Sequence, residues 1–437
     1  MTANTGRAEV FDLGARGGTS STDQTRRNEI LQTAASLIAS SGLRTSLQQI
    51  ADAAGILPGS LYHHFESKDA ILLELMRQYH ADLDRLGEIA QAGLDQAGSR
   101  SALDQIVDLG AAIADFAVQH RAQLQMSFYE SPSSNAELVE LAQRQPVAIQ
   151  QAMLEALRAG RWSGVIRTDL DLAVLADRIC QTMLHVGLDV IRHDAASDQV
   201  SRVLAAIILR GLATTDPSDA DLDRSSAFVS ADTIVRAWSD EQADDPKDKA
   251  AYVRAVARAE FGRRGYELTT VREIASAAGM ATGTVHRLIG SKEELLMSIM
   301  RSFGEKVGAG WTGVLGSDST PLEKLDALSW VNVNVLDKFS DEFRIQLAWM
   351  RQSPPDTPNP GWSFSTRLNQ MRTLLSQGIG SGELRQQKSS LETVARCIIG
   401  IQWIPQNILT TVGKRSALLH VRDTVLHGIA TREDTPA

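Results

Sequence analysis

Hydrogen-bond donors of several kinds are concentrated in one short block of this 437-residue sequence. The block carries hydroxyl, amide, imidazole and ammonium groups on Ser46, Gln48, Ser60, Tyr62, His63, His64 and Lys68. Such donors suit phosphate oxygens, and only a few of them need to reach the edges of bases. We find no Ser-His-Asp order, glycine-rich phosphate loop, paired-carboxylate helix or metal-ligand spacing. The sequence therefore predicts neither an enzyme nor a cofactor or metal site.

The same block occurs a second time. The segment Ile50-Ala-Asp-Ala-Ala-Gly55 returns 224 positions later as Ile274-Ala-Ser-Ala-Ala-Gly279, and Gly59, Ser67 and Lys68 recur at the same separation. Weaker matches continue along the chain at a separation that falls slowly to 218, as small insertions and deletions would produce. A repeat of this period decides the architecture, so we predict a duplicated domain rather than a solenoid.

Short helices must position these donors. Apolar residues recur at helical spacing from Asp23, and Gly42 supplies a stop. Short helices follow from Ser46 to Ala53 and from Pro58 to His64, and Ser67 then caps a long helix. The corresponding helices of the copy are predicted at Tyr252 to Gly265, Thr270 to Ala278, Thr282 to Leu288 and from Lys292 onward. Two short helices joined by a glycine-containing turn are typical of a helix-turn-helix.

On these residues, each half resembles the TetR family of transcriptional regulators. The pattern Ile-Ala-x-x-x-Gly, then Gly-Ser-Leu-Tyr-x-His-Phe-x-Ser-Lys, matches residues 50–68. The resemblance implies that Gln48 reads a base, that Ser46 and Ser60 face the DNA, and that Lys68 meets a phosphate at a helix end. It assigns phosphate contacts to Tyr62, His63 and His64 as well. The whole chain resembles actinobacterial tandem TetR repressors, including the type that controls mammalian-cell-entry (mce) lipid-transport operons.

The second copy departs from the pattern. Arg272 replaces Gln48, His286 replaces Tyr62 and Arg287 replaces His63. Arginine suits guanine where glutamine suits adenine, so this copy either reads a different half-site or grips mainly phosphate. A copy kept only for folding is the alternative. The contacts predicted for the second copy are Thr270, Arg272, Thr282, Thr284, His286, Arg287 and Lys292.

The net charge of −9 is unevenly distributed. Residues 247–306 hold eleven basic and seven acidic side chains, whereas residues 214–246 hold nine acidic and two basic ones. An amphipathic fragment in this connector, from Phe228 to Trp238, predicts a short helix resting on one unit. The predicted organisation is a mobile tail (1–23), a first helix-turn-helix domain (24–70), a first regulatory domain (71–213), an acidic linker (214–247), a second helix-turn-helix domain (248–294) and a second regulatory domain (295–430).

The regulatory regions are predicted to be helical, which makes the fold class all-α. Each ends in apolar helices, Leu172 to Ile191 with Val200 to Leu212 and Leu391 to Thr411 with Leu418 to Ile429, that need a partner surface. Tryptophans gather in the second half, and packed core is the default explanation for them. The alternative is a pocket for a bulky apolar, lipid- or steroid-like effector, with Trp330, Trp349 and Trp403 as its lining. Pro405 is predicted to kink its helix.

The leading hypothesis is a ligand-responsive repressor that binds a double-stranded operator. Because family members pair through their last two helices, one chain could replace the usual homodimer, and tethering would keep the second reader close. A homodimer of two chains is the alternative assembly. A ligand-sequestering or protein-interaction module with vestigial DNA readers is the alternative function. The sequence shows no leader and no bilayer-length apolar run, so we expect a cytoplasmic protein without membrane contact.

Overall fold

The computed structural model describes residues 22–41, 43, 45–95, 101–127, 135–193, 196–240, 248–352 and 364–431. In these ranges the chain forms α-helices and one π-helix, and its extended pairings are two isolated β-bridges. The predicted all-α class is therefore correct. Residues 1–21 of the predicted tail lie outside the described ranges. Across the described helices, none combines the length and apolar character needed to cross a bilayer.

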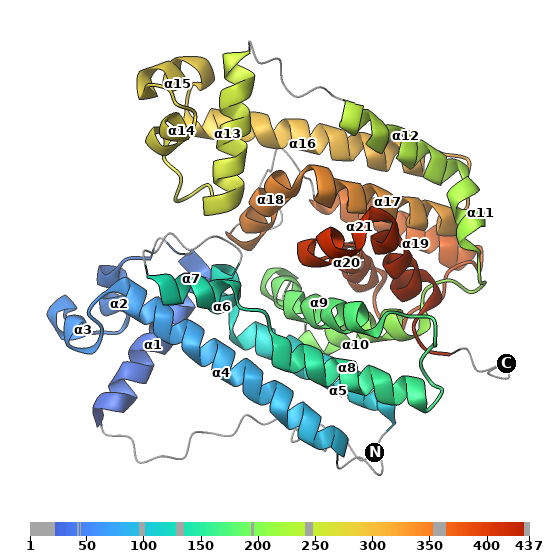
Figure 1. Ribbon diagram of the computed structural model, residues 1–437, viewed down its shortest axis with the longest axis horizontal. Helices are drawn as coiled ribbons and strands as arrows, with labels where there is room; N and C mark the ends of the chain where they lie inside the picture. Colours follow the sequence, from blue (N-terminus) through green and yellow to red (C-terminus); the bar gives the residue numbers. More distant parts are fainter. Residues whose placement is uncertain are drawn as a thin grey trace. The chain divides into compact units, whose positions relative to one another are not determined.

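The first repeat begins with a helix-turn-helix and continues into long helices (Figure 1). Its helices are α1 (Thr22–Ser41), α2 (Leu47–Ala53), α3 (Pro58–His64), α4 (Lys68–Asp95), α5 (Ala102–Gln119), α6 (Arg121–Met126), α7 (Ala136–Gln143), α8 (Val147–Trp162), α9 (Leu172–His193) and α10 (Ser197–Arg210). The bounds of α2 and α3, and the start of α4, are those that the capping residues predict.

The second repeat follows the same order. Its helices are α13 (Lys249–Arg264), α14 (Val271–Ala277), α15 (Thr282–Ile289), α16 (Lys292–Leu315), α17 (Pro321–Lys338), α18 (Ser340–Gln352), α19 (Phe364–Gly380), α20 (Leu391–Ile401), α21 (Gln406–Val421) and the π-helix η1 (Arg422–His427). Pro405 precedes the first residue of α21. The single kinked helix predicted around Pro405 is thus two separate helices, because proline lacks the N–H that would continue α20.

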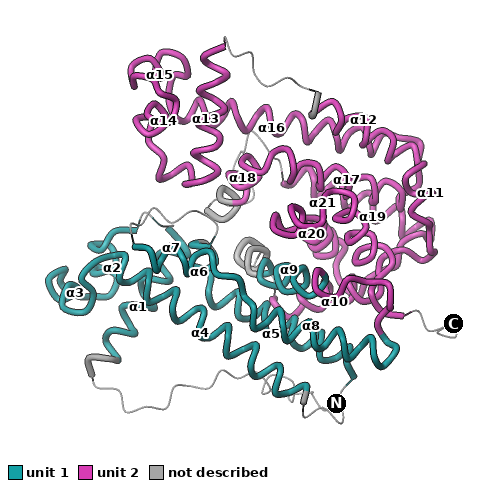
Figure 2. Tube along the Cα trace, viewed as in Figure 1, with its two compact units in different colours: residues 1–165, 175–190 teal, residues 166–174, 191–437 magenta. Residues whose placement is uncertain are grey.

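The chain divides into two compact units that differ from the two repeats (Figure 2). Unit 1 contains residues 1–165 and 175–190, and unit 2 contains residues 166–174 and 191–437. The last helix of the first repeat, α10, therefore belongs to unit 2, where it packs against α20 and η1. Its apolar residues Val203, Leu204, Ile207 and Ile208 are buried. The predicted domain boundary at residue 213 follows the repeat, whereas the packing places α10 with the second repeat.

The acidic connector is not an open linker. It forms α11 (Asp219–Arg224) and α12 (Ser226–Asp240), and α12 packs against α16 and α17 of unit 2. Trp238 is buried there, and its ring lies 5.2 Å from the ring of Phe339. Gly313 of α16 lets α12 come close, because a β-carbon at that position would lie 2.6 Å from Ile234 Cδ1. The helix predicted from Phe228 to Trp238 is therefore present and holds the connector on unit 2.

Within unit 2, the ends of the two repeats exchange backbone hydrogen bonds reciprocally. Leu212 N donates to Val425 O at 2.8 Å, and Ile429 N donates to Ile208 O at 3.0 Å. Ile429 lies 217 positions after Leu212, and Val425 lies 217 positions after Ile208. The second bond therefore repeats the first with donor and acceptor exchanged between the two repeats. Ala213 N with Leu426 O, and Ala430 N with Leu209 O, form the next such pair, at 3.0 and 2.9 Å.

The segments after α8 and α19 extend this exchange. Arg167 N donates to Ile429 O at 3.0 Å, and Arg385 N donates to Leu212 O at 2.7 Å. The two β-bridges, Ile166 with Ala430 and Ala213 with Leu384, lie in the same places. Contacts that recur with exchanged partners are what a two-fold axis produces. This part of unit 2 therefore has approximate two-fold symmetry between the two repeats.

Two glycines lie where these segments cross. Gly211 and Gly428 have φ angles of +67° and +80°, which favour glycine strongly. A β-carbon on Gly211 would lie 2.1 Å from Leu426 O, and one on Gly428 would lie 2.4 Å from Arg210 C. No side chain fits at either position, so the crossing depends on both glycines.

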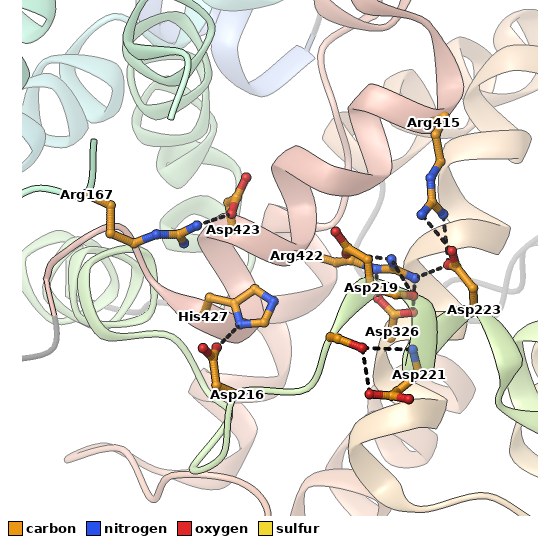
Figure 3. Close-up of polar contacts among 11 residues, drawn as sticks. Arg167, Asp216, Asp219, Asp221, Asp223, Asp326, Arg415, Arg422, Asp423 and His427 are labelled. Carbon is orange, nitrogen blue, oxygen red and sulfur yellow. Dashed lines mark hydrogen bonds and ion pairs between the residues drawn. The ribbon is translucent and has the colours of Figure 1, made fainter. Parts of the chain in front are cut away.

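An ion-pair cluster fastens α11 to the end of the second repeat (Figure 3). The guanidinium of Arg422 is buried and donates to both carboxylate oxygens of Asp326, each at 2.9 Å. It also pairs with Asp219 and Asp223 of α11, at 2.7 Å each. Burial opposes the charged form, but the hydrogen bonds to Asp326 and the α11 aspartates raise the pKa of Arg422. The residue at the corresponding position of the first repeat is Ala205, so this fastening belongs to the second repeat alone.

Candidate nucleic-acid interface

The first reader, which we define as α1 to α3 with the start of α4, is a small bundle around an apolar core. Its turn between α2 and α3 contains Gly55, whose φ is +65°. Ser46 caps α2 by accepting from Gln49 N at 3.2 Å, while Gln49 Oε1 accepts from Ser46 N at 2.8 Å. This capping box fixes where α2 begins. The buried core residues are Ile30, Ile38, Ile50, Leu61 and Phe65.

Two arginines of α1 hold the short helices in place. Arg26 Nη2 donates to Ala54 O at 3.1 Å, at the end of α2. Arg27 donates to His64 O, at the end of α3, and its guanidinium carbon lies 4.1 Å from the Phe65 ring centroid. Sequence reasoning missed both residues, because an arginine on a surface helix gives no sign of its partner. Each one satisfies a carbonyl at the C-terminus of a reader helix.

The donors predicted to meet DNA in the first reader are largely exposed. Ser60, Tyr62 and His63 are exposed on α3, and His64 is half-buried. Gln48 is exposed on α2, where its Nε2 donates to Asp52 Oδ1 at 2.8 Å. The structure thus brings the predicted residues of α2 and α3 into one reader, with side chains available to a ligand.

Lys68 has an internal partner. Its ammonium donates to Leu43 O in the loop before α2, and burial lowers its pKa. The counterpart Lys292 donates to Tyr266 O and Thr269 O, at 2.7 Å each, and lies 4.1 Å from the Tyr266 ring centroid. Both lysines therefore tie the start of the long helix to the loop before the helix-turn-helix. An ammonium has three protons, so phosphate contact by these lysines stays a prediction.

The second reader, which we define as α13 to α15 with the start of α16, repeats the scaffold. Gly279 has the φ of Gly55, +65°. Thr270 and Glu273 form the capping box of α14, with Glu273 N donating to Thr270 Oγ1 at 3.2 Å and Thr270 N to Glu273 Oε2 at 2.7 Å. Its buried core residues are Val253, Ala257, Phe261, Ile274 and Val285.

The helices of the second reader are held together by different contacts. Positions 26 and 27 correspond to Ala250 and Ala251. In their place, Arg264 of α13 pairs with Glu273 of α14 at 2.6 Å. This pair and the capping box lower the pKa of Glu273, mainly through the hydrogen bond from Thr270 N. The two readers therefore share a core and a turn but not the contacts that lock them.

The predicted DNA-facing residues of the second reader are also accessible. Arg272, Thr282, His286 and Arg287 are exposed, and Thr284 is half-buried. His286 Nδ1 lies 3.3 Å from Gly290 O, at the C-terminus of α15. The exposed cations Arg272 and Arg287 replace the neutral Gln48 and the imidazole of His63. The second reader therefore presents a more cationic surface than the first.

The tryptophans predicted to line an effector pocket have packing partners. Trp330 Nε1 donates to Asp232 Oδ1 at 3.2 Å, and its ring stacks on Phe228 of α12 with centroids 5.7 Å apart. Trp403 stacks on Phe343 with centroids 4.1 Å apart. The side chain of Trp349 lies outside the described residues. Within the described ranges, no group of three His, Cys, Asp or Glu side chains is placed to hold a metal ion.

Comparison with known proteins finds the same family model in both readers. The family model described as "Bacterial regulatory proteins, tetR family" matches twice, at residues 30–75 and 253–299. The HTH-type transcriptional repressor KstR2 of Rhodococcus jostii is 34% identical over 43% of this chain and 92% of its own length. KstR2 of Mycolicibacterium smegmatis is 32% identical over 44% of this chain and 94% of its own. A solved structure of the ketosteroid transcriptional regulator KstR2 of Mycobacterium tuberculosis aligns with 29% identity over 42% of this chain and 92% of that chain, with a TM-score of 0.34.

The chain belongs to the TetR family of DNA-binding transcriptional regulators and carries two tandem units. The matched segments contain the buried cores of the two readers and the turns at Gly55 and Gly279. The KstR2 proteins of Rhodococcus jostii and Mycolicibacterium smegmatis are transcriptional repressors, and less than half of this chain spans almost the whole length of each.

Proposed function

We propose that this protein is a cytoplasmic, sequence-specific repressor in which one chain acts as a pseudo-dimer on one operator. The reciprocal hydrogen bonds between residues 208–213 and 425–430 carry the proposal. TetR regulators are dimeric, and a two-fold dimer uses the same surface of both subunits. The approximate two-fold symmetry in unit 2 is the arrangement expected if the two halves of one chain replace two subunits.

The two readers are proposed to recognise different half-sites. Gln48 is suited to adenine, and Arg272 at the corresponding position is suited to guanine. Ser46, Ser60, Tyr62, His63, His64 and Lys68 would contact the backbone and groove at one half-site, and Thr270, Thr282, Thr284, His286, Arg287 and Lys292 would do so at the other. Because the two halves are unequal, the operator need not be a palindrome.

A small apolar effector is proposed to release the protein from DNA. The support is the likeness to KstR2, which is described as a ketosteroid transcriptional regulator. We therefore propose a lipid- or steroid-like molecule. Trp403 and Phe343, which stack in the second regulatory region, are the proposed contact site. Trp330 is less suited to this role than the sequence suggested, because it holds α12.

The test is selection of bound duplexes from a random-sequence pool, followed by footprinting of the selected DNA. We expect protection over two unlike half-sites. Gln48→Ala should relax base preference in one half-site, and Arg272→Ala with Arg287→Ala should remove protection from the other. Recovery of no preferred sequence would contradict the proposed function. Unchanged protection in all variants would contradict the assignment of these residues.

A further inference from the structure

The connector helix α12 precedes the second reader in the chain and packs on α16, the helix that begins in that reader. The two helices lie side by side (Figure 1), and Lys292 is the first residue of α16. A β-carbon on Gly313 would lie 3.1 Å from Ser230 Oγ, and one on Gly310 would lie 3.6 Å from Trp238 Cζ2. Because Gly310 is the nearer of the two glycines to Lys292, α12 runs toward the reader, and Trp238 lies at its reader end.

Trp238 contacts the corner between α17 and α18. Its ring meets the ring of Phe339 edge to face, with an angle of 64° between the ring planes. Phe339 is buried and lies between the last residue of α17 and the first residue of α18. Phe303 of α16 packs on the same ring, with centroids 5.9 Å apart. Side chains of α12 and α16 therefore hold the corner at which α18 begins.

The helix that begins at this corner, α18, holds the second reader. It packs against α13, the first helix of the reader. A β-carbon on Gly262 would lie 2.7 Å from Asp341 Cβ, so no larger side chain separates the two helices there. Arg258 Nη1 donates to Glu342 Oε1 at 3.3 Å, and only 8% of the Glu342 side chain is exposed. Both acidic residues lie in the first turn of α18, directly after Phe339.

We propose that α12 is a clamp that fixes the position of the second reader, through the contact of Trp238 with Phe339 and the contact of α18 with α13. Side chains packed in an unbroken series carry such coupling between two sites. A reader that spends less time in its binding position binds DNA more weakly in proportion. The connector therefore takes part in DNA binding as well as joining the two repeats. Its effect on DNA rests on the proposed function, whereas its effect on the reader does not.

The other end of α12 provides a matched control. Phe228 stacks on Trp330 of α17, with centroids 5.7 Å apart, and it lies about 15 Å from Trp238 along the helix axis. Phe228 and Trp238 are both buried. Truncating either one removes a large apolar side chain from the same helix and destabilises unit 2. The two truncations differ in their distance from Phe339 and α18, and this difference isolates the clamp.

The first test measures amide hydrogen exchange in full-length Trp238→Ala and Phe228→Ala without DNA. Both variants should melt at a lower temperature than the wild-type chain. Exchange in α13 and α18 should accelerate more in Trp238→Ala than in Phe228→Ala, because exchange reports local opening. Equal acceleration of α13 and α18 in the two variants would overturn the proposal. If Trp238→Ala does not fold, Trp238→Leu takes its place, since it keeps an apolar side chain but lacks the ring that meets Phe339.

The second test measures binding to the duplex selected with the wild-type chain. Trp238→Ala should bind about tenfold more weakly if its second reader holds the binding position in about one molecule in ten. Protection should weaken only over the half-site that Arg272→Ala with Arg287→Ala also loses. The slope of log affinity against log salt should not change, because no basic residue is removed. Phe228→Ala should bind as the wild-type chain does.

Two outcomes of the binding test would overturn the proposal. One is equal binding by Trp238→Ala and Phe228→Ala, because α12 would then serve stability alone. The other is weaker protection over both half-sites in Trp238→Ala, because the effect would then not belong to the second reader. If the wild-type chain selects no duplex, the proposed function fails, and hydrogen exchange alone decides whether α12 holds the reader.

Discussion

The two readers share one scaffold. They differ in the contacts that hold their helices together and in their exposed side chains. Gly55 and Gly279 have the same φ, and capping boxes start α2 and α14 in the same way. The first reader is locked by Arg26 and Arg27 of α1, whereas the second uses a pair between Arg264 and Glu273. The comparison teaches that the core, the turn and the cap determine the helix-turn-helix, while the exposed face is free to change. Equal folds therefore imply two DNA-binding scaffolds, but not two equal binding sites.

The two regulatory regions likewise share a core contact and differ around it. Tyr79 packs on Phe116 with centroids 5.3 Å apart, and the corresponding Phe303 and Phe339 lie 5.9 Å apart. Around this shared pair the halves diverge, because the first has the buried His80 and the half-buried His120, and the second has an ion-pair cluster and α12. Substitutions in these unshared features should affect one half far more than the other.

The largest expected effect is at Arg422, which has Ala205 as its counterpart. Arg422→Ala would leave Asp326 buried without its partner and would release α11. Breaking a buried ion pair in this way costs about 3–5 kcal/mol of unfolding free energy. Chemical denaturation should show this loss in unit 2. Arg415→Ala, which removes a more exposed pair with Asp223, should cost at most about 1 kcal/mol. Equal losses in the two variants would contradict the assigned role of the cluster.

The next largest effect is expected at Lys68 and Lys292. Both lysines donate hydrogen bonds to backbone carbonyls of their own reader. If each also meets a phosphate, Lys68→Ala and Lys292→Ala should each weaken operator binding. Each should also flatten the plot of log affinity against log salt by about one unit. Titrations at several salt concentrations measure this slope. A loss of affinity with an unchanged slope would mean that the lysine acts only by holding the reader together.

The smallest expected effect is a loss of folding stability at acidic pH. Burial lowers the pKa of His80, and it lowers the pKa of His120 although Asp82 opposes the shift. The unfolded chain therefore binds more protons than the folded one once the pH falls below the ordinary histidine pKa of about 6.5. Stability should decline from that pH downward, by up to about 1.4 kcal/mol per pH unit for each histidine.

This decline should be confined to the first repeat, because the corresponding residues of the second are Gly304 and Phe343. Hydrogen exchange at pH 7 and pH 5.5, corrected for the intrinsic rate, should show weaker protection in α4 and α5 at the lower pH. His120→Phe, which copies the second repeat, should reduce the effect. An equal loss of protection in α16 and α17 would refute the assignment.

Local signals made much of the fold predictable. Ser46 marked the start of α2, Pro58 the start of α3, and the 224-residue repeat located the second reader. The amphipathic fragment from Phe228 to Trp238 predicted α12. These features depend on neighbouring residues, which sequence patterns record directly. Gln48, Tyr62 and Arg272 are exposed, and their contact with DNA, which the family resemblance implies, stays a prediction.

Long-range pairing left few such signals. The exchange between residues 208–213 and 425–430 uses backbone groups, which every residue has, and only Gly211 and Gly428 mark it. The burial of Arg422 depends on Asp219, Asp223 and Asp326, of which two lie in a connector that looked like an open acidic linker. The arginines that lock the first reader were missed for the same reason, because their partners are carbonyl oxygens. The assignment of α10 to unit 2 likewise follows from packing across the two repeats.

The central claim is that one chain supplies both readers of one operator. Light scattering on the complex with the selected duplex measures it directly, by giving the protein mass bound per DNA. The pseudo-dimer predicts one chain of 47.4 kDa per duplex, independent of concentration, with both half-sites protected. A stable mass of two chains, present free and kept on DNA, would contradict it and favour a homodimer.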